Sequence, residues 1–277
     1  MQLRIGLLVC SFVFVTSCAT TNVKLQGAGQ GEPSTFTLAC SNPPFPNPTA
    51  DSDIDTCPNT GAPGNDAALS DEYASKNALC VPGPPVDVSV HTFARLQAAM
   101  EKRNIPYGGP GVRITDRSVL EALTKVKGAP IGEGSLVRVV GHVTEVTKTY
   151  DKASNGEGVN CNRSGPENND IHINIGPTDK SLPCEGIVVE MIPHHRPAGW
   201  TSAVARALVH GPAVRVTGHV FFDGRHGLFA CDEQGTPRRM SLFEIHPVYT
   251  FDVCINDSDA QCDVNDDSVW ADLGAIQ

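Results

Sequence analysis

The sequence lacks most of the short motifs that announce a known chemistry. It has no Cys-x-x-Cys pair, which argues against a zinc ribbon and against a thioredoxin-type redox centre. The Gly-x-Ser-x-Gly elbow of serine hydrolases, the phosphate-binding loop of NTPases and the His-Glu-x-x-His motif of metalloproteases are also absent. No catalytic residue can therefore be assigned from local spacing.

Basic residues are few. The 21 lysines and arginines are outnumbered by 31 acidic residues, so the net charge is −10. Because phosphate contacts need a basic surface, this balance argues against a nucleic-acid partner.

Long hydrophobic runs are missing beyond the N-terminus. The one strongly apolar run, Ile5–Val15, follows Arg4 and is shorter than the roughly 20 residues of a transmembrane helix. Its length and position are typical of an export signal. The run ends in "VTSC", residues 15–18, which resembles the lipobox of bacterial lipoproteins.

This resemblance implies that residues 1–17 are a signal peptide and that Cys18 carries lipid, palmitate included. The alternatives are an ordinary cleaved signal and a short anchor. Several acyl chains on Cys18 would hold the protein stably to a membrane. We therefore expect a bacterial cell-envelope protein, anchored outside the cytoplasm, with the membrane as its first partner.

The number of cysteines is typical of an exported protein stabilised by disulfides. Of the 10 present, Cys10 leaves with the signal and Cys18 takes the lipid. An even number remains, which in an exported chain predicts up to four disulfides of open pairing. The candidates are Cys40, Cys57, Cys80, Cys161, Cys184, Cys231, Cys254 and Cys262.

The flanking segments differ in composition from the middle of the chain. Residues 18–86 hold 10 of the 21 prolines without sustained periodicity, which predicts an extended tether. Residues 87–130 show helical spacing, with one helix around residues 89–104 and a second, short one over residues 116–126. The last segment, 255–277, has six aspartates and no lysine or arginine, and is expected to be an acidic tail.

Residues 131–254 carry the signals of a mainly β domain. Period-two patterns predict five strands, over residues 136–146, 170–176, 186–192, 213–222 and 240–253, with a helix over residues 200–210 between the third and fourth. Three strands, a helix and two strands resemble the OB-fold, a five-stranded Greek-key barrel.

The block from residue 87 to 254 also resembles a group of uncharacterised exported bacterial proteins. The resemblance lies in "EMIPH", "VRVTGHVFFD" and "EIHPV", and it implies no activity. Staphylococcal-type nucleases share the barrel fold, but their arginine and carboxylate arrangement has no match here.

Strand alternation sorts the polar residues of the barrel. Eight of the nine histidines lie in residues 142–246. If the isoleucines of each strand face the core, their polar neighbours face outward. The residues expected on one outer face, and as candidate binding residues, are Asp170, His172, Asn174, Glu190, His194, Glu244 and His246. In the loop after the fourth strand, Asp223 and His226 are expected to extend this site.

Three functions fit this surface. The leading prediction is a binding or interaction module that uses the outer face and the loops 151–169 and 224–237 to hold an envelope protein or a small ligand. The alternative is a metal-dependent hydrolase, because two histidines and two carboxylates suit a divalent metal such as zinc; its ligands would be His172, Glu190, Glu244 and His246. A purely structural envelope component is the third, with cross-strand His–Glu pairs as plain surface contacts.

Overall fold

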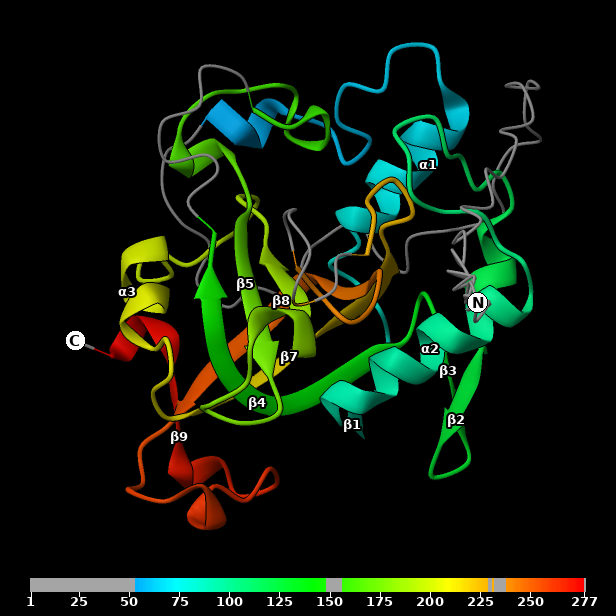
Figure 1. Cartoon of the computed structure of the whole chain (residues 1–277). Coiled ribbons are helices and arrows are strands. Elements are labelled where there is room, and N and C mark those ends of the chain that lie inside the picture. Colours follow the sequence, from blue (N-terminus) through cyan, green and yellow to red (C-terminus); the bar gives the residue numbers. More distant parts are fainter. Residues whose placement is uncertain (1–52, 148–155, 229–230, 232–237, 277) are drawn as a thin grey trace, which may run out of the picture.

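The structure is a computed structural model that describes residues 53–147, 156–228, 231 and 238–276 (Figure 1). The expected signal peptide, the lipid attachment site Cys18, Cys40 and the first part of the expected tether lie outside the described residues. Within them the chain is mainly β, with few helices.

A closed five-stranded barrel forms the centre of the molecule. Neighbouring strands pair in the order β4-β5-β6-β8-β7, and β7 pairs back with β4 to close the barrel. All pairs are antiparallel except β6 with β8, which is parallel. The bounds are β4 Leu136–Val146, β5 Ile171–Gly176, β6 Ile187–Met191, β7 Ala213–Phe222 and β8 Phe243–Cys254.

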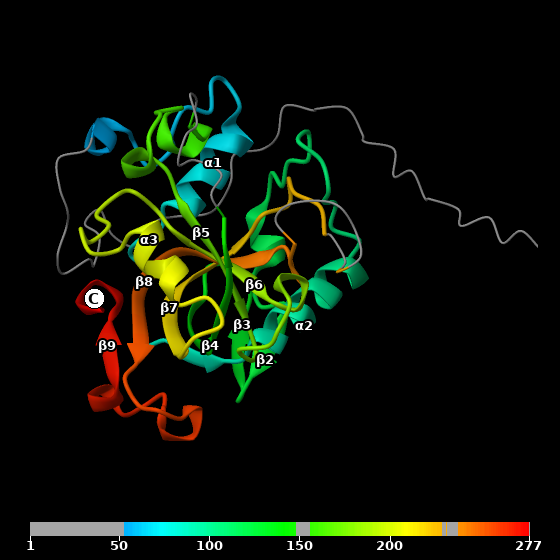
Figure 2. The ribbon, with the colours of Figure 1, turned by 60° about the vertical axis from the view of Figure 1, so that its left-hand side comes forward.

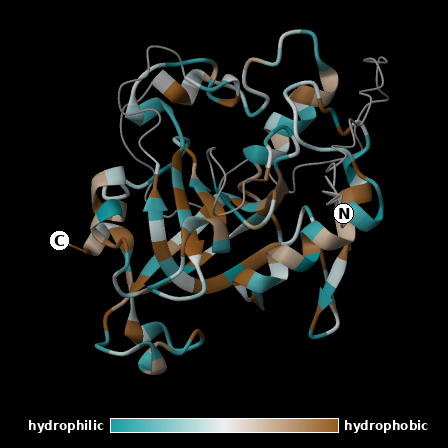
Figure 3. Ribbon diagram, in the orientation of Figure 1, coloured by the Kyte–Doolittle hydropathy of each residue, from teal (hydrophilic) through white to brown (hydrophobic). Residues whose placement is uncertain are grey.

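The predicted alternation fills the barrel interior. Ile173, Val189 and Ile245 are fully buried and belong to one hydrophobic cluster. Hydrophobic colour is concentrated along the barrel strands and on α2 (Val90–Lys102) in Figure 3. Burial of this apolar surface is the main favourable term for the fold.

Two glycines let the barrel strands come close. A Cβ atom on Gly218 of β7 would lie 2.4 Å from the Ile245 side chain, and one on Gly141 of β4 would lie 2.5 Å from Ile175 Cγ2. The β7–β8 register also shifts on both sides of Gly218. A larger residue at either position would push neighbouring strands apart, which explains the glycine shared by residues 137–143, "VRVVGHV", and residues 214–220, "VRVTGHV".

The segment before the barrel differs from the prediction after its first helix. α2 forms as expected, but residues 116–126 form only the 3-10 turn η2, Arg117–Leu120, and then a strand. Ala122 has a φ of 47°, which ends any helix there. The strand belongs to a hairpin of β2 (Thr124–Val126) and β3 (Ala129–Ile131), while β1 (Val86–Val88) pairs in parallel with β4.

The second half of the expected tether is folded, which corrects the prediction for residues 53–86. It contains the 3-10 turn η1 (Asp53–Thr56) and helix α1 (Ala67–Lys76), capped by the Asp66 side chain. Leu69 and Tyr73 of α1 pack against Val159 in a small cluster of their own. This proline-rich segment therefore contains a helix with an apolar contact surface in addition to extended chain.

This folded segment, residues 53–81, lies across one outer side of the barrel, and we call it the cover. Figures 1 and 2 both place α1 and η1 at the end of the barrel where the chain enters β5, next to the turns of residues 158–168. Tyr249 of β8 donates a hydrogen bond from its hydroxyl to the Ala78 carbonyl at 2.6 Å. The Val81 amide donates back to the same hydroxyl at 3.0 Å.

The acidic C-terminal segment is also packed on the barrel rather than extended. β9 (Trp270–Asp272) pairs with β8, and Arg215 of β7 pairs with both Asp252 and Asp267. The Arg215 guanidinium also lies 5.1 Å from the centre of the Trp270 ring. These contacts neutralise part of the negative charge of the segment. The helix α3, Ser202–Ala207, is shorter than the predicted 200–210.

Three disulfides join the predicted cysteines, as Cys57–Cys161, Cys184–Cys231 and Cys254–Cys262. Cys80 is disulfide-bonded too. Disulfides persist in oxidising surroundings, so the protein belongs to a non-cytoplasmic compartment. Among the described helices, none is both long and apolar enough to cross a membrane.

Candidate metal centre

The barrel strands bring four of the predicted site residues together. Asp170 directly precedes β5, His172 lies on β5, Glu190 on β6 and His246 on β8. His172 is the register partner of Glu190, and Val189 pairs with Ile245 in the parallel β6–β8 pair. Adjacent register therefore places the side chains of all three strands side by side on one outer face.

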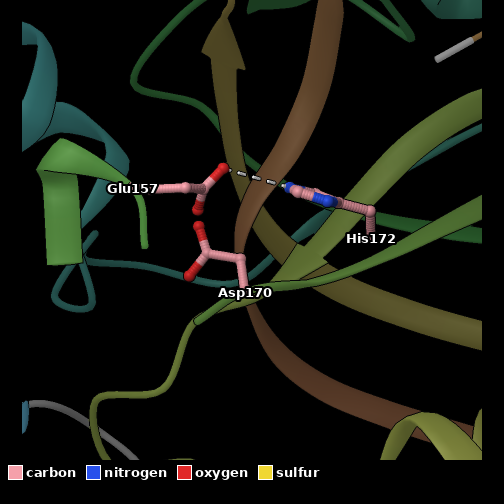
Figure 4. Close-up of side chains that lie close together, drawn as sticks. All are labelled: Glu157, Asp170 and His172. Carbon is pink, nitrogen blue, oxygen red and sulfur yellow. Dashed lines mark ion pairs between the residues drawn. The ribbon is translucent and has the colours of Figure 1, made fainter. Parts of the chain in front are cut away.

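Their nitrogen and oxygen atoms converge closely. His246 Nε2 lies 2.9 Å from Glu190 Oε2 and 3.3 Å from Asp170 Oδ2. The same Glu190 oxygen lies 3.1 Å from His172 Nε2, which in turn lies 3.6 Å from Glu157 Oε1. Figure 4 shows Glu157 and His172 facing each other, with the Asp170 carboxylate beside them.

Two groups of three ligand atoms result. Asp170, Glu190 and His246 form one group, and Glu157, Asp170 and His172 form the other. Within each group all the ligand atoms lie within 4.8 Å of one another. We call these five residues the metal cluster.

The metal cluster is buried, which corrects the expectation of a solvent-exposed face. His246 is 0% exposed and Glu190 4%, while His172 is half-buried. The outward direction of these side chains was predicted correctly, but the cover lies over them. Buried charges are costly unless they are paired or bind a metal, so this arrangement needs a compensating partner.

The orientation of His246 matches that of a metal ligand. Its Nδ1 lies 2.8 Å from the Lys76 carbonyl oxygen, which only accepts, so Nδ1 carries the proton and donates it there. The remaining nitrogen, Nε2, is thereby directed at Asp170 and Glu190. Ligating histidines are commonly held in this way through the opposite ring nitrogen. Asn160 supports Asp170 similarly, donating to Oδ1 at 3.0 Å.

Within the described chain, the three central atoms make no hydrogen bond of ordinary geometry. They are His246 Nε2, Glu190 Oε2 and Asp170 Oδ2, and each is fully buried. Their nearest partners are one another, through the ion pairs of His246 with Glu190 and Asp170, and three converging ligand atoms of this kind can also hold a metal ion.

Without a metal ion, protons must compensate the charges. Burial lowers the pKa of His172 and His246, but the charge and hydrogen bonds of Glu190 and the neighbouring carboxylates together outweigh it and raise both to about 10. Burial would raise the pKa of Glu190, but the two histidines and Lys76 hold it well below its usual value. Burial and the nearby Asp170 raise the pKa of Glu157 to about 8.

Glu244 belongs to a second cluster, which corrects its place among the predicted metal ligands. Its Oε2 accepts a hydrogen bond from Arg239 Nη1 at 2.6 Å. Arg239 also reaches Asp223 at 3.2 Å, and Asp223 pairs with His226 at 2.5 Å. The loop residues thus extend the polar layer as predicted, but through Arg239 and not through a metal ligand. Burial, with Glu190 and Asp223 nearby, raises the pKa of Glu244 to about 8.

Two other predicted site residues lie apart from the metal cluster. Asn174 accepts from the Thr144 hydroxyl at 3.0 Å and donates to the Arg238 carbonyl at 2.8 Å, so it holds strands and loops together. His194 is buried beyond the end of β6 and is in neither group of ligand atoms.

A pocket of about 290 Å³ opens beside the metal cluster. Glu157 contributes to its wall, so the pocket reaches the cluster directly. The other lining residues come from the cover and from two loops: Glu72, Tyr73, Lys76, Pro110, Gly158, Val159, Asp223, Arg225 and His226.

No family model, curated protein or solved structure matches this chain. The geometry of the site is therefore the basis for proposing a function.

Sequence reasoning missed three important residues of this site. Lys76 lies in the segment expected to be a tether, and Glu157 in a long loop. Arg239 precedes a predicted strand, outside any periodic pattern that would indicate the direction of its side chain. One sequence pattern could have predicted the helix that carries Lys76. Asp66 is a good N-cap residue, and Glu72 and Lys76 after it are four residues apart, as in a stabilising helical pair.

Proposed function

We propose that the protein is a metal-dependent hydrolase of the bacterial cell envelope. The observation that carries this proposal is the convergence of three buried ligand atoms from Asp170, Glu190 and His246 beside an open pocket. A contact surface for a partner would need this face to be exposed, and the cover occupies it.

Asp170, Glu190 and His246 would hold the metal, with His172 completing its coordination. A mixed set of imidazole and carboxylate donors suits zinc or another divalent transition metal, and zinc is our choice. A bound metal would polarise the substrate and make water more acidic.

Glu157 is the candidate acid–base residue. It lies at the boundary between the metal cluster and the pocket. Its carboxylate lies 3.6 Å from His172 Nε2 and on the pocket wall, so it would be placed to exchange a proton with a bound water or substrate.

Elemental analysis of the full chain after export tests the metal site. We expect one equivalent of zinc per chain, lost in the His172→Ala/His246→Ala variant, and hydrolysis of ester or amide substrates that stops in chelator. The proposal is overturned if the folded protein binds no metal at any divalent-ion concentration tested, whether or not it is active. It would favour the binding module or the structural component instead.

We further propose that the barrel is of the OB type. The support is its strand order, together with α3 lying between its third and fourth strands along the chain. An experimental structure in which β6 and β8 do not pair would contradict this assignment.

The lipid anchor is a separate proposal, supported by the "VTSC" sequence at residues 15–18. Palmitate labelling and membrane fractionation of a Cys18→Ser variant test it. We expect both label and membrane association to disappear, and their persistence would refute a lipid on Cys18.

A further inference from the structure

Lys76, the last residue of α1, is a buried cation without a direct partner. Its side chain is largely enclosed, with the residue 7% exposed. In the described part of the chain no carboxylate pairs with its ammonium, and no acceptor receives a hydrogen bond from it. The ammonium lies near the Phe221 ring, whose centre is 5.4 Å from Nζ. Lysines are almost never this buried unless they are paired.

Most of the carboxylates around Lys76 pair with other groups. Glu190 pairs with His172 and His246, and Glu157 lies beside His172. Asp223 and Glu244 both pair with Arg239. Glu72, four residues before Lys76 on α1, is a fifth acid whose charge acts on it. Within the described residues, the ammonium forms an ion pair with none of these five carboxylates.

Lys76 lines the pocket beside the metal cluster, and it is not the only cationic residue there. Arg225 also lines the pocket, and its Nε is buried without a hydrogen-bond partner. His226 lies on the same wall, where it pairs with Asp223. Two cationic residues, Lys76 and Arg225, therefore line a space of about 290 Å³ that Glu157 connects to the proposed metal.

We infer that this pocket is an oxyanion subsite, in which the phosphate group of a small phosphoester binds between the divalent metal and the Lys76 ammonium, with Arg225 as a second donor. The inference rests on the proposed function and names its substrate class. One phosphate oxygen would contact the metal and another would accept from Nζ. Charge-assisted donors of this kind are the strongest that proteins offer to phosphate.

The hydrolysis that follows is balanced without a further reactant. The oxygen of water forms a bond to phosphorus, and the bond between phosphorus and the ester oxygen breaks. One proton of the water passes to the departing alkoxide, which leaves as an alcohol, while the other proton stays on the product phosphate. Lys76 would stabilise the charge on the phosphoryl oxygens through this step. It would act as a fixed cation and not as a base.

Titration calorimetry of the zinc-loaded full chain with inorganic phosphate tests the subsite. We expect Lys76→Met to weaken phosphate binding at least tenfold, and Lys76→Arg to keep most of it. Lys102→Met is the matched control, because Lys102 is also the last residue of its helix but is exposed. It should bind phosphate like the unchanged protein.

Zinc affinity measured on the same variants separates the two proposals. If the unchanged chain binds no zinc but binds phosphate in a way that depends on Lys76, the metal proposal fails and the subsite is supported. If phosphate binds neither with nor without zinc, or binds equally to Lys76→Met, the subsite is overturned. Sulfate and acetate serve as competitors, and acetate binding as tightly as phosphate would overturn the phosphoester assignment.

Discussion

The inner and outer faces of β5, β6 and β8 are both buried, yet their chemistry is opposite. Inside the barrel, Ile173, Val189 and Ile245 form part of a continuous apolar core. One residue further along two of these strands, Glu190 and His246 are equally inaccessible but carry charge. Apolar burial stabilises a fold directly, whereas buried charge stabilises it only when compensated.

Burying the charged side chains of the outer layer costs free energy, and the fold does not need charged residues at these positions. A hydrophobic residue at the same positions would pack under the cover without needing partners, and replacing buried ion pairs in this way is often neutral or stabilising. Strained or costly arrangements of this type concentrate at functional sites. The contrast between the two faces is therefore itself an argument for a site beneath the cover.

The largest expected effect comes from neutralising one outer residue, Glu190→Gln. Glu190 Oε2 contacts both histidines, so its loss should weaken zinc binding by about a hundredfold or more, beyond the range typical of residues that only support ligands. The inner neighbour provides the control: Val189→Ala should lower the free energy of unfolding by about 2 kcal/mol through a cavity, with zinc binding retained. Calorimetry and denaturant unfolding of both variants measure this. Equal zinc affinity in the two would remove the functional distinction between the faces.

A smaller effect is expected from detaching the cover. The Cys57–Cys161 bond joins the cover to the turn that carries Asn160, and Asn160 supports Asp170. It spans 104 residues of sequence, so Cys57→Ser/Cys161→Ser should cost about 4.7 kcal/mol by loop closure and reduce zinc affinity about tenfold.

The Cys254–Cys262 bond is the control for the cover. It spans only 8 residues and lies away from the metal cluster. The corresponding double serine variant should cost about 2.5 kcal/mol by loop closure and leave zinc affinity unchanged. If both double variants bind zinc equally well, the cover does not order the metal cluster.

The stability contributed by the metal-free outer face should depend on pH, because its residues titrate. The apolar side chains inside the barrel do not titrate, so their contribution should not change. His172 and His246, with pKa values of about 10 in the folded chain against an ordinary 6.5, bind protons more tightly when folded. Their stabilisation is complete below about pH 6.5 and is lost as pH rises through about 10. Glu157 and Glu244, whose pKa values are raised to about 8, act in the same direction between pH 4.5 and 8.

In chelator, the free energy of unfolding should therefore fall steadily as pH rises from about 6.5 to about 9.5. Zinc should reverse the trend over pH 6 to 8, because metal binding releases protons from the histidines. Denaturant titrations at several pH values measure both. A chelated protein of constant stability across this range would show that the cluster is not charged as described.

Much of the barrel, and part of the site, could be predicted from sequence. Period-two alternation placed all five strands and the direction of His172, Glu190 and His246, because one residue of register decides the face of each side chain. It could not tell an exposed outer face from a covered one. That depends on α1, whose few apolar residues, such as Leu69 and Tyr73, lie within proline-rich sequence without strong periodicity. Glu157 and Lys76 reach the site through long-range packing, which spacing along the chain does not encode.

The smallest effect on metal binding is expected at Glu244, where sequence and structure disagree. Spacing placed Glu244 among the ligands with His246, its neighbour two residues on, but its carboxylate is held by Arg239 at 2.6 Å. Glu244→Gln should change zinc affinity less than about threefold, as expected for a residue outside the ligand shell. It should still lower the free energy of unfolding by about 1–3 kcal/mol, because Arg239 keeps only one of its two buried counter-charges. A loss of zinc affinity comparable with that of Glu190→Gln would return Glu244 to the metal centre and merge the two clusters into one.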